Sequence, residues 1–304
     1  MLSQQEIETY DRDGYLLVKE AVTAEQLVAM RLATKTLIDQ SRTITQSDHR
    51  FDLDEGHGPN NPRLTRIKLP HKLDRIYWDI LKDSKMTKVL NALLGPNTMI
   101  QTTKLNTKAP GGGQAVEWHQ DWAFYPHTND TMLAFGLMLE DVDEANGPLQ
   151  VIPGSHKGSV LAHTNSDGVF CGAVDPEDPD FDYSKAVTLT GKAGDMTVHH
   201  VRTLHGSAPN LSDRARKILF YELSAADAWP INGIAGGYTG LPQLDLWQKM
   251  QASMICGTQP AAARLEKVPA VMPVPPAPDS TSIFKVQASG GAKSAFAEPE
   301  AAEA

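Results

Sequence analysis

The chain has 304 residues, of which 41% are hydrophobic and 21% are charged, and its formal net charge is −9 at neutral pH. Such a composition is ordinary for a folded protein with one large domain or two small ones. The acidic balance disfavours nucleic acid as the main partner, because phosphate binding needs a basic surface. No stretch of about 18 apolar residues is present, so we expect no membrane span.

Two cysteines, Cys171 and Cys256, lie far apart in the sequence and outside any CxxC pair. Two such thiols cannot build a disulfide framework, so a reducing compartment is the simplest location. The first residues, MLSQQEIETYDRDGY, are polar and acidic and contain no apolar signal-peptide core. We therefore expect a cytoplasmic protein.

Most of the first 95 residues are predicted to be helical. A short helix covers residues 3–12, and a turn then leads into a strand at 15–18. Thr23 is a candidate N-cap for a helix that runs to residue 40, because apolar residues recur there at helical spacing. A second helical zone covers residues 73–95 and ends at a Gly-Pro pair.

The segment 41–72 between these helices is polar and is predicted to be irregular. We interpret the basic cluster at its end as a solvated face, or as a patch that meets an anionic substrate or the protein's own acidic residues. The cluster consists of Arg63, Arg66, Lys68, His71, Lys72 and Arg75.

Short strands dominate the chain after residue 97. They are rich in Val, Thr, Leu and Phe, and Gly, Pro and Asn separate them. Helices followed by many short strands predict an α+β protein whose N-terminal helices pack on one sheet of a sandwich or barrel. The predicted strands lie at 98–108, 132–141, 148–155, 185–190, 195–201 and 217–224.

The composition changes near residue 268, where a proline-rich stretch begins, and the last residues are mainly small or acidic. Such a sequence offers few apolar side chains for a packed core. We therefore predict one domain over residues 1–267 and an extended, Pro/Ala-rich C-terminal tail over residues 268–304.

The motif WHQD at residues 118–121 contains the strongest candidates for metal ligands. Alternate residues of a strand point to the same face, so His119 and Asp121 are able to reach one point. A nitrogen and a carboxylate ligand, completed by a third ligand from elsewhere, are typical of non-haem Fe(II) oxygenases. His205, between two predicted strands, is the candidate third ligand. Arg216 follows it, and a guanidinium binds a carboxylate through two parallel hydrogen bonds.

The pattern WHQD, then NGPLQVIPGSHK, then HGSAPN and an arginine resembles the phytanoyl-CoA dioxygenase family of Fe(II)/2-oxoglutarate-dependent oxygenases. The resemblance extends from about Tyr10 to the 220s. It implies a double-stranded β-helix core, that is, a cupin-like jelly roll. It also implies a non-haem iron dioxygenase that uses O₂ to oxidise a C–H bond, most simply by hydroxylation, and that releases succinate and CO₂.

The resemblance also implies residue roles. The iron ligands would be His119, Asp121 and His205. The far carboxylate of 2-oxoglutarate would be bound by Arg216 with support from Ser207, and Asn106 would be a further cosubstrate-binding residue. Asp121 indicates oxygenation rather than halogenation, because halogenating relatives carry a small residue in its place.

Several other residues near the motif have two interpretations each. The candidate substrate contacts are Trp122, Phe124, Tyr125 and Tyr221, and packing in the core is the alternative for each of them. The Gly-rich segment 233–240 is a second candidate frame for an apolar substrate. We interpret His199 and His200 as structural strand residues, with His200 at most behind the metal ligands.

We expect the substrate to be a small or medium organic metabolite of secondary metabolism or catabolism, and a homodimer is a plausible assembly. Two other functions stay open on the sequence alone. One is a cupin-like metal enzyme that does not use 2-oxoglutarate, which a succinate assay would distinguish. The other is a non-catalytic jelly-roll binding protein, which metal analysis would distinguish.

Overall fold

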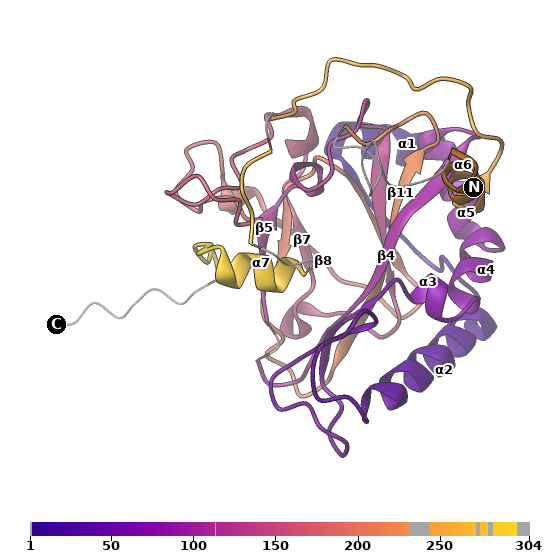
Figure 1. Cartoon of the computed structure of the whole chain (residues 1–304). Coiled ribbons are helices and arrows are strands. Elements are labelled where there is room, and N and C mark those ends of the chain that lie inside the picture. Colours follow the sequence, from indigo (N-terminus) through magenta and orange to yellow (C-terminus); the bar gives the residue numbers. More distant parts are fainter. Residues whose placement is uncertain (1, 113, 232–242, 272–273, 279–281, 297–304) are drawn as a thin grey trace.

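The computed structural model describes residues 2–112, 114–231, 243–271, 274–278 and 282–296. It shows a mixed α/β protein with two antiparallel sheets, and helices cover one face of the larger sheet (Figure 1). The predicted combination of N-terminal helices with later antiparallel strands is therefore confirmed. Both cysteines are free, in line with the expectation that they form no disulfide framework.

The larger sheet has the strand order β1-β9-β6-β11-β4-β3-β2, and β12 also pairs with β4. Its longest pairing joins β4 and β11, which run antiparallel from Arg216 opposite Lys108 to Ala225 opposite Thr98. The strands are β1 (Tyr15–Val18), β2 (Phe51–Leu53), β3 (Leu64–Lys68), β4 (Thr98–Lys108), β6 (Met132–Met138), β9 (Met196–His200), β11 (Arg216–Ala225) and β12 (Met254–Cys256).

The smaller sheet has the order β5-β10-β7-β8. Its strands are β5 (Val116–His119), β7 (Leu149–Val151), β8 (Val187–Leu189) and β10 (His205–Ser207). Each of the six predicted strand segments after residue 97 overlaps one observed strand; β6, β7, β8 and β9 are shorter than predicted, and β11 is longer.

The first two long helices, α1 and α2, begin at residues whose side chains cap them. The side-chain oxygens of Ser3 and Thr23 each accept a hydrogen bond from a backbone N–H of the first turn. The side chains of Glu6 and Gln26 in turn accept a hydrogen bond from the backbone N–H of Ser3 and Thr23. The predicted zone 73–95 divides into two helices. The helices are α1 (Gln4–Asp13), α2 (Ala24–Ser41), α3 (Pro70–Leu73), α4 (Ile76–Lys82), α5 (Lys85–Leu94), α6 (Gln243–Ala252) and α7 (Ile283–Ser289).

The main core lies between the N-terminal helices and the larger sheet. Met30 of α2, Leu81 of α4 and Val89 of α5 are fully buried in one cluster with Leu105 of β4 and Leu219 of β11. Burying these side chains contributes about 1.5–3 kcal/mol each to folding. None of the described helices is both long enough and apolar enough to cross a lipid bilayer.

Two predictions of irregular structure were wrong. The segment 41–72 contains β2 and β3, because Ile67 and Phe51 are buried and β3 pairs with the long strand β4. The segment after residue 268 is not extended throughout, because α7 buries Phe284 and Val286 against the body of the protein. A short helix needs few apolar residues when it docks on an existing surface. The division of the chain at residue 267 stays a prediction.

Candidate metal and cosubstrate site

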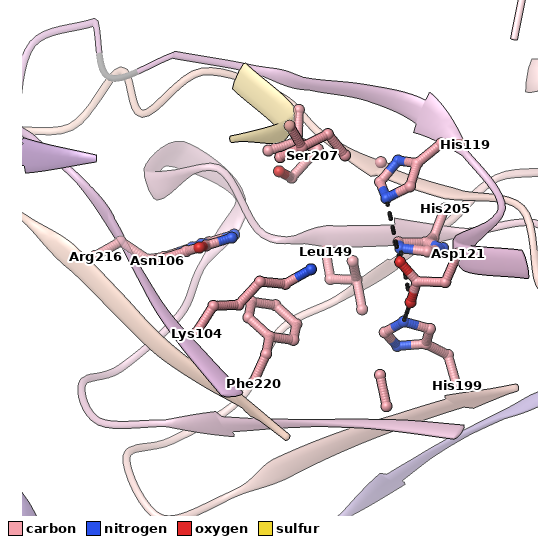
Figure 2. Close-up of a pocket in the computed structure, with 14 residues that line it drawn as sticks. Lys104, Asn106, His119, Asp121, Leu149, His199, His205, Ser207, Arg216 and Phe220 are labelled. Atoms are coloured by element: carbon pink, nitrogen blue, oxygen red, sulfur yellow. Dashed lines mark ion pairs between the residues drawn. The ribbon is translucent and has the colours of Figure 1, made fainter. Parts of the chain in front are cut away.

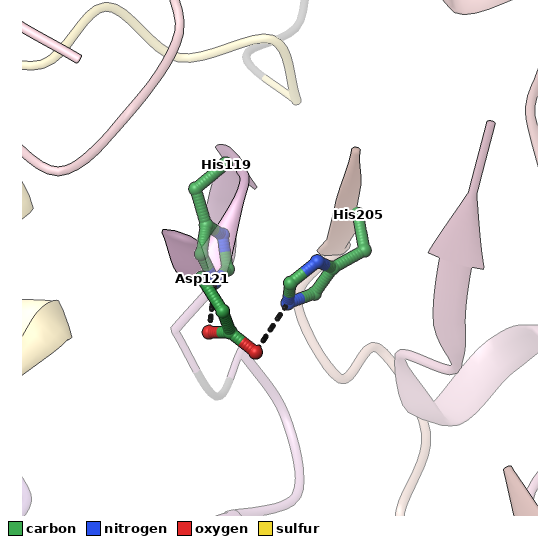
Figure 3. Close-up of side chains that lie close together, drawn as sticks. All are labelled: His119, Asp121 and His205. Carbon is green, nitrogen blue, oxygen red and sulfur yellow. Dashed lines mark ion pairs between the residues drawn. The ribbon is translucent and has the colours of Figure 1, made fainter. Parts of the chain in front are cut away.

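Three predicted metal ligands meet where the smaller sheet ends. β5 and β10 pair antiparallel with His119 directly opposite His205, and the two ring centroids lie 4.1 Å apart. The carboxylate of Asp121 lies beside both rings, 3.7 Å from His119 Nε2 and 3.9 Å from His205 Nε2 (Figure 3). One ligand atom from each residue lies within 4.8 Å of the others, so a single metal ion is able to contact all three.

Asp121 reaches this point from a different local structure than predicted. β5 ends at His119, and Asp121 is the first residue of a short 3-10 turn, η1 (Asp121–Ala123). Gln120 between them is still extended, with φ −117° and ψ 125°. The alternation of side chains therefore continues through Gln120, and His119 and Asp121 face the same side.

Backbone carbonyls fix the tautomer of both histidine ligands. Nδ1 of His119 donates to the carbonyl oxygen of Glu117 at 2.7 Å, and Nδ1 of His205 donates to that of Thr203 at 2.9 Å. A neutral imidazole that donates from Nδ1 carries its lone pair on Nε2. Both Nε2 atoms face Asp121 and are available to a metal.

Burial sets the charges of these three groups. Loss of solvent lowers the pKa of His119 to about 4 and holds the pKa of His205 well below its usual value. Burial alone would raise the pKa of Asp121, but His205, His199 and Lys104 outweigh it and hold that pKa well below its ordinary value. At neutral pH the site therefore offers two neutral nitrogens and one anionic oxygen, the donor set of a non-haem iron centre.

His199 was interpreted as a structural residue, and it lies beside the metal ligands. Its Nε2 is 3.4 Å from Asp121 Oδ2, and its ring centroid is 4.3 Å from that of His205. The side chain is buried and lines the same cavity as the three ligands (Figure 2). His199 thus lies against Asp121 from the side of β9, and neither of its ring nitrogens has a hydrogen-bond partner among the described residues.

Arg216 is a buried cation that faces the same cavity. Its Nη2 donates to the carbonyl oxygen of Gly147 at 2.6 Å, while its Nε has no hydrogen-bond partner. No carboxylate of the described residues pairs with it. Burial lowers the pKa of Arg216 to about 9, which leaves the guanidinium charged at neutral pH. A buried cation without a counter-ion is costly, so this position favours an incoming anion.

Ser207 lies on the same strand as His205 and receives a contact that the sequence did not reveal. Lys108, at the end of β4, is buried, and its Nζ donates to Ser207 Oγ at 2.8 Å and to the Ser207 carbonyl oxygen at 3.1 Å. The ammonium also donates to the carbonyl oxygen of Ala208. Lys108 therefore holds the Ser207 hydroxyl in place.

Asn106 completes the polar lining of this cavity. It lies next to Arg216 in Figure 2, and its buried Oδ1 has no hydrogen-bond partner. One cavity thus brings together all six residues predicted to bind metal or cosubstrate. An unpaired guanidinium, a buried hydroxyl and a buried amide fit the far carboxylate of 2-oxoglutarate, and the His and Asp set fits Fe(II).

Comparison with known proteins identifies the family. The sequence profile of the family described as phytanoyl-CoA dioxygenase matches residues 10–218, more than half of the chain. The chain belongs to the phytanoyl-CoA dioxygenase family. The predicted enzyme class, a non-haem iron dioxygenase that uses 2-oxoglutarate, is thereby confirmed.

Individual relatives of this phytanoyl-CoA dioxygenase family member agree on the class. A probable alpha-ketoglutarate-dependent hypophosphite dioxygenase of Stutzerimonas stutzeri is 34% identical over 94% of this chain and 97% of its own. An ectoine dioxygenase of Bordetella parapertussis is 26% identical over 72% of this chain and 74% of its own. The crystal structure of EctD from S. alaskensis with 2-oxoglutarate and 5-hydroxyectoine is similar in fold, with a TM-score of 0.63, 23% identity and 88% coverage of each chain.

A second, larger cavity of about 560 Å³ adjoins Asp121 in this family member. Phe124 and Tyr125 line it, and their role as substrate contacts stays a prediction. Burial, followed by the nearby carboxylates of Asp121 and Glu222, raises the pKa of the Tyr125 hydroxyl, which stays protonated. The cavity has apolar and cationic walls.

The structure does not bring Trp122 and Tyr221 to either cavity. The indole of Trp122 donates to the carbonyl oxygen of Pro269 and packs in a separate apolar cluster. The hydroxyl of Tyr221 donates to the carbonyl oxygen of Tyr77 at 2.6 Å, inside the main core. Core packing, the alternative considered for both residues, is what the structure shows. The Gly-rich segment 233–240 lies outside the described residues.

Proposed function

We propose that the protein uses Fe(II), O₂ and 2-oxoglutarate to oxidise a C–H bond of a small or medium organic metabolite, in the simplest case by hydroxylation. One observation carries the proposal. A single cavity joins two neutral histidines and an ionised Asp121 to the unpaired, buried guanidinium of Arg216. The metal ligands alone would also suit a cupin-like enzyme without 2-oxoglutarate. The buried cation beside them favours a carboxylate cosubstrate.

The fold and the residue roles are part of the same proposal. We assign the two antiparallel sheets to a double-stranded β-helix, supported by their pairing and by the likeness to EctD. His119, Asp121 and His205 would hold the iron, and Arg216, Ser207 and Asn106 would bind the far carboxylate of 2-oxoglutarate. A cytoplasmic location and a homodimer stay predictions.

When bound, iron and 2-oxoglutarate supply the oxidising chemistry, with release of succinate and CO₂. The residues of the chain position and protect the reactants. The carbonyl oxygens of Glu117 and Thr203 hold both histidine rings with Nε2 toward the metal position. Phe124 and residues of helix α7 line the cavity beside Asp121, where they would contact the substrate.

The size of the cavity bears on the substrate. The relative from Stutzerimonas stutzeri acts on hypophosphite according to its name. Hypophosphite has three heavy atoms and needs only roughly 90 Å³ if each atom takes about the volume of a water molecule. The cavity beside Asp121 measures about 560 Å³, which lies within the range of pockets that hold organic ligands. We therefore favour an organic substrate and include hypophosphite as a comparison.

The test is release of succinate from 2-oxoglutarate in the presence of Fe(II) and ascorbate, first without and then with candidate substrates. We expect Asp121→Ala to abolish iron-dependent turnover, and Arg216→Ala to raise the KM for 2-oxoglutarate at least tenfold, since a charged hydrogen bond contributes about 1.5–3 kcal/mol. Lys192→Gln, an exposed lysine outside both cavities, serves as the matched control. Full activity in Asp121→Ala would refute the metal site, and an unchanged KM in Arg216→Ala would refute the cosubstrate site.

A further inference from the structure

The larger cavity has a cationic wall formed by neighbouring strands of the larger sheet. Arg66 and Lys68 come from β3 and Lys104 comes from β4, and all three line the cavity. Lys104 also lines the smaller cavity that contains the metal ligands, so this wall begins next to Asp121 (Figure 2). Arg66 and Lys68 belong to the basic cluster at residues 63–75 of the sequence, and Lys104 does not.

The acidic partners of these cations do not balance them. Arg66 and Lys68 share one carboxylate, that of Asp52, with Nη2 and Nζ each 2.8 Å from an oxygen of it. Lys104 pairs with Glu222 at 2.8 Å. Three cations therefore face two carboxylates, and one positive charge is left over. Asp121 also attracts Lys104, but in the proposed function the charge of Asp121 would be taken up by the metal ion that it would hold.

The cations of this wall lie close together, although the carboxylates of Glu222 and Asp121 outweigh burial and raise the pKa of Lys104. Lys68 lies directly opposite Lys104 in the pairing of β3 with β4. Like charges directly opposite each other destabilise an antiparallel pair. Both side chains are mostly shielded from solvent, with 20% and 21% of the Lys68 and Lys104 side chains exposed. Poor access of water weakens the screening of their repulsion, so an anion between them would relieve it.

The cavity also has an apolar part. Ile283 and Val286 of α7 line it together with Phe124 and Leu69. This part is firmly attached, because Gln287 of the same helix accepts from the Glu117 N–H at 3.0 Å and donates to the carbonyl oxygen of Gly172 at 2.9 Å. A molecule that fills the cavity therefore meets both positive charge and hydrocarbon.

We infer that the substrate is an organic oxyanion, with a carboxylate or phosphonate group bound by Lys68, Lys104 and Arg66 and an apolar body packed against α7. This inference rests on the proposed function, which places the reacting bond next to Asp121. The negative group is held on the β3–β4 side, and the apolar body fills the space under α7. Specificity for an anion is thus built into residues that bind neither iron nor 2-oxoglutarate.

The inference is tested by binding, without catalysis. The full-length protein is loaded with Mn²⁺ and a saturating amount of N-oxalylglycine, an unreactive analogue of 2-oxoglutarate, so that Arg216 is already occupied. Isothermal titration then compares four probes with the same six-carbon chain: hexanoate, hexylphosphonate, hexanamide and hexylamine. We expect at least one of the two anions to bind at least about tenfold more tightly than the amide, as a charge-assisted hydrogen bond allows. The tighter of the two anions identifies the headgroup.

Lys68→Gln is the variant that isolates the surplus charge. It leaves Asp52 paired with Arg66 and leaves Lys104 paired with Glu222, so the wall becomes neutral without an unpaired buried carboxylate. We expect this variant to lose the roughly tenfold preference for the anion and to bind N-oxalylglycine as the wild type does. Lys192→Gln, whose lysine is 81% exposed, is the control and keeps the preference.

The outcomes separate the two proposals. Equal affinity for the anions and the amide, or tighter binding of hexylamine, would overturn the inference while the cosubstrate site stands. Retention of the anion preference in a folded Lys68→Gln protein would overturn the assignment to this wall. Failure of N-oxalylglycine to bind in the presence of Mn²⁺ would instead contradict the proposed function, and it is observed before any probe is added.

Discussion

Replacing Lys108 by methionine is the strongest test of how the cosubstrate half of the site is built. The three protons of the ammonium go to Ser207 Oγ and to the carbonyl oxygens of Ser207 and Ala208. A hydroxyl that accepts from an ammonium keeps its own proton for a different acceptor. Ser207 lines the cavity that contains Arg216, so Lys108 directs the Ser207 O–H toward the carboxylate of 2-oxoglutarate.

The size of the effect follows from the hydrogen bond that is lost. A hydrogen bond to a charged group contributes about 1.5–3 kcal/mol, and each 1.4 kcal/mol is about tenfold in affinity. We expect Lys108→Met to raise the KM for 2-oxoglutarate by about 10- to 100-fold and to change kcat by less than about threefold. Succinate release at varied 2-oxoglutarate gives both constants, and titration with N-oxalylglycine gives the affinity directly.

The pH dependence provides a second readout. Burial, and then the charge of Arg216, lower the pKa of Lys108 well below that of an ordinary lysine. The charged form binds a carboxylate better than the neutral form. Affinity for 2-oxoglutarate is therefore full below the lowered pKa and is lost as the pH rises through it. Lys108→Met removes this part of the pH dependence.

The double variant with Ser207→Ala decides whether Lys108 acts through Ser207. If it does, Lys108→Met adds little to the KM of a protein that already lacks the hydroxyl, because the two residues form one unit. Full additivity of the two effects on KM would refute this reasoning, because it would show that Lys108 acts on 2-oxoglutarate binding independently of Ser207. Thermal unfolding of each variant shows whether a raised KM reflects loss of the fold.

Two further variants test the packing around the site. Tyr221→Phe removes the hydroxyl that donates to the carbonyl oxygen of Tyr77. We expect urea unfolding to show a free energy of unfolding lower by about 1–2 kcal/mol, with substrate oxidation unchanged. A loss of activity without a loss of stability would instead place Tyr221 in the substrate site. Gln287→Ala removes the partner of the Glu117 N–H and of the Gly172 carbonyl oxygen. We expect this variant to lower the free energy of unfolding by about 2 kcal/mol. Unaltered stability would contradict the docking of α7 on β5.

Much of the site could be predicted from the period of a strand. The strand 98–108 was predicted and Asn106 was assigned to the cosubstrate, and a period of two places Lys104 and Lys108 on the same face. By the same rule, Arg216, Phe220 and Glu222 lie on one face of β11. Tyr221 lies on the other face, toward the helices. The strand period alone is therefore enough to predict that Lys108 shares the face of Asn106 and that Tyr221 points away from the site.

Other parts of the site depend on contacts that no local pattern encodes. Helix α7 lies in a stretch whose small and proline-rich composition predicted an extended tail, and it becomes helical because the surface at β5 accepts it. His199 reaches Asp121 only because β9 ends beside the smaller sheet. Such long-range packing is decided by the assembled sheets and not by the residues before and after each position.

The basic cluster at residues 63–75 is visible in the sequence, but only the structure shows which of its members are exposed and which line the cavity. The sequence leaves open a solvated face and a patch that meets an anionic substrate or the protein's own acidic residues; the structure shows the first for Arg75 and a shared acidic partner for Arg66 and Lys68, while binding of an anionic substrate stays a proposal. Arg75 is 82% exposed and pairs with Asp79 one helical turn away, as expected of a solvated face. Arg66 and Lys68 lie two apart on β3, so both face the cavity, and a single carboxylate serves them both. The surplus charge arises from this pairing between β2 and β3, and it gives a substrate-facing role to residues that composition alone describes as basic.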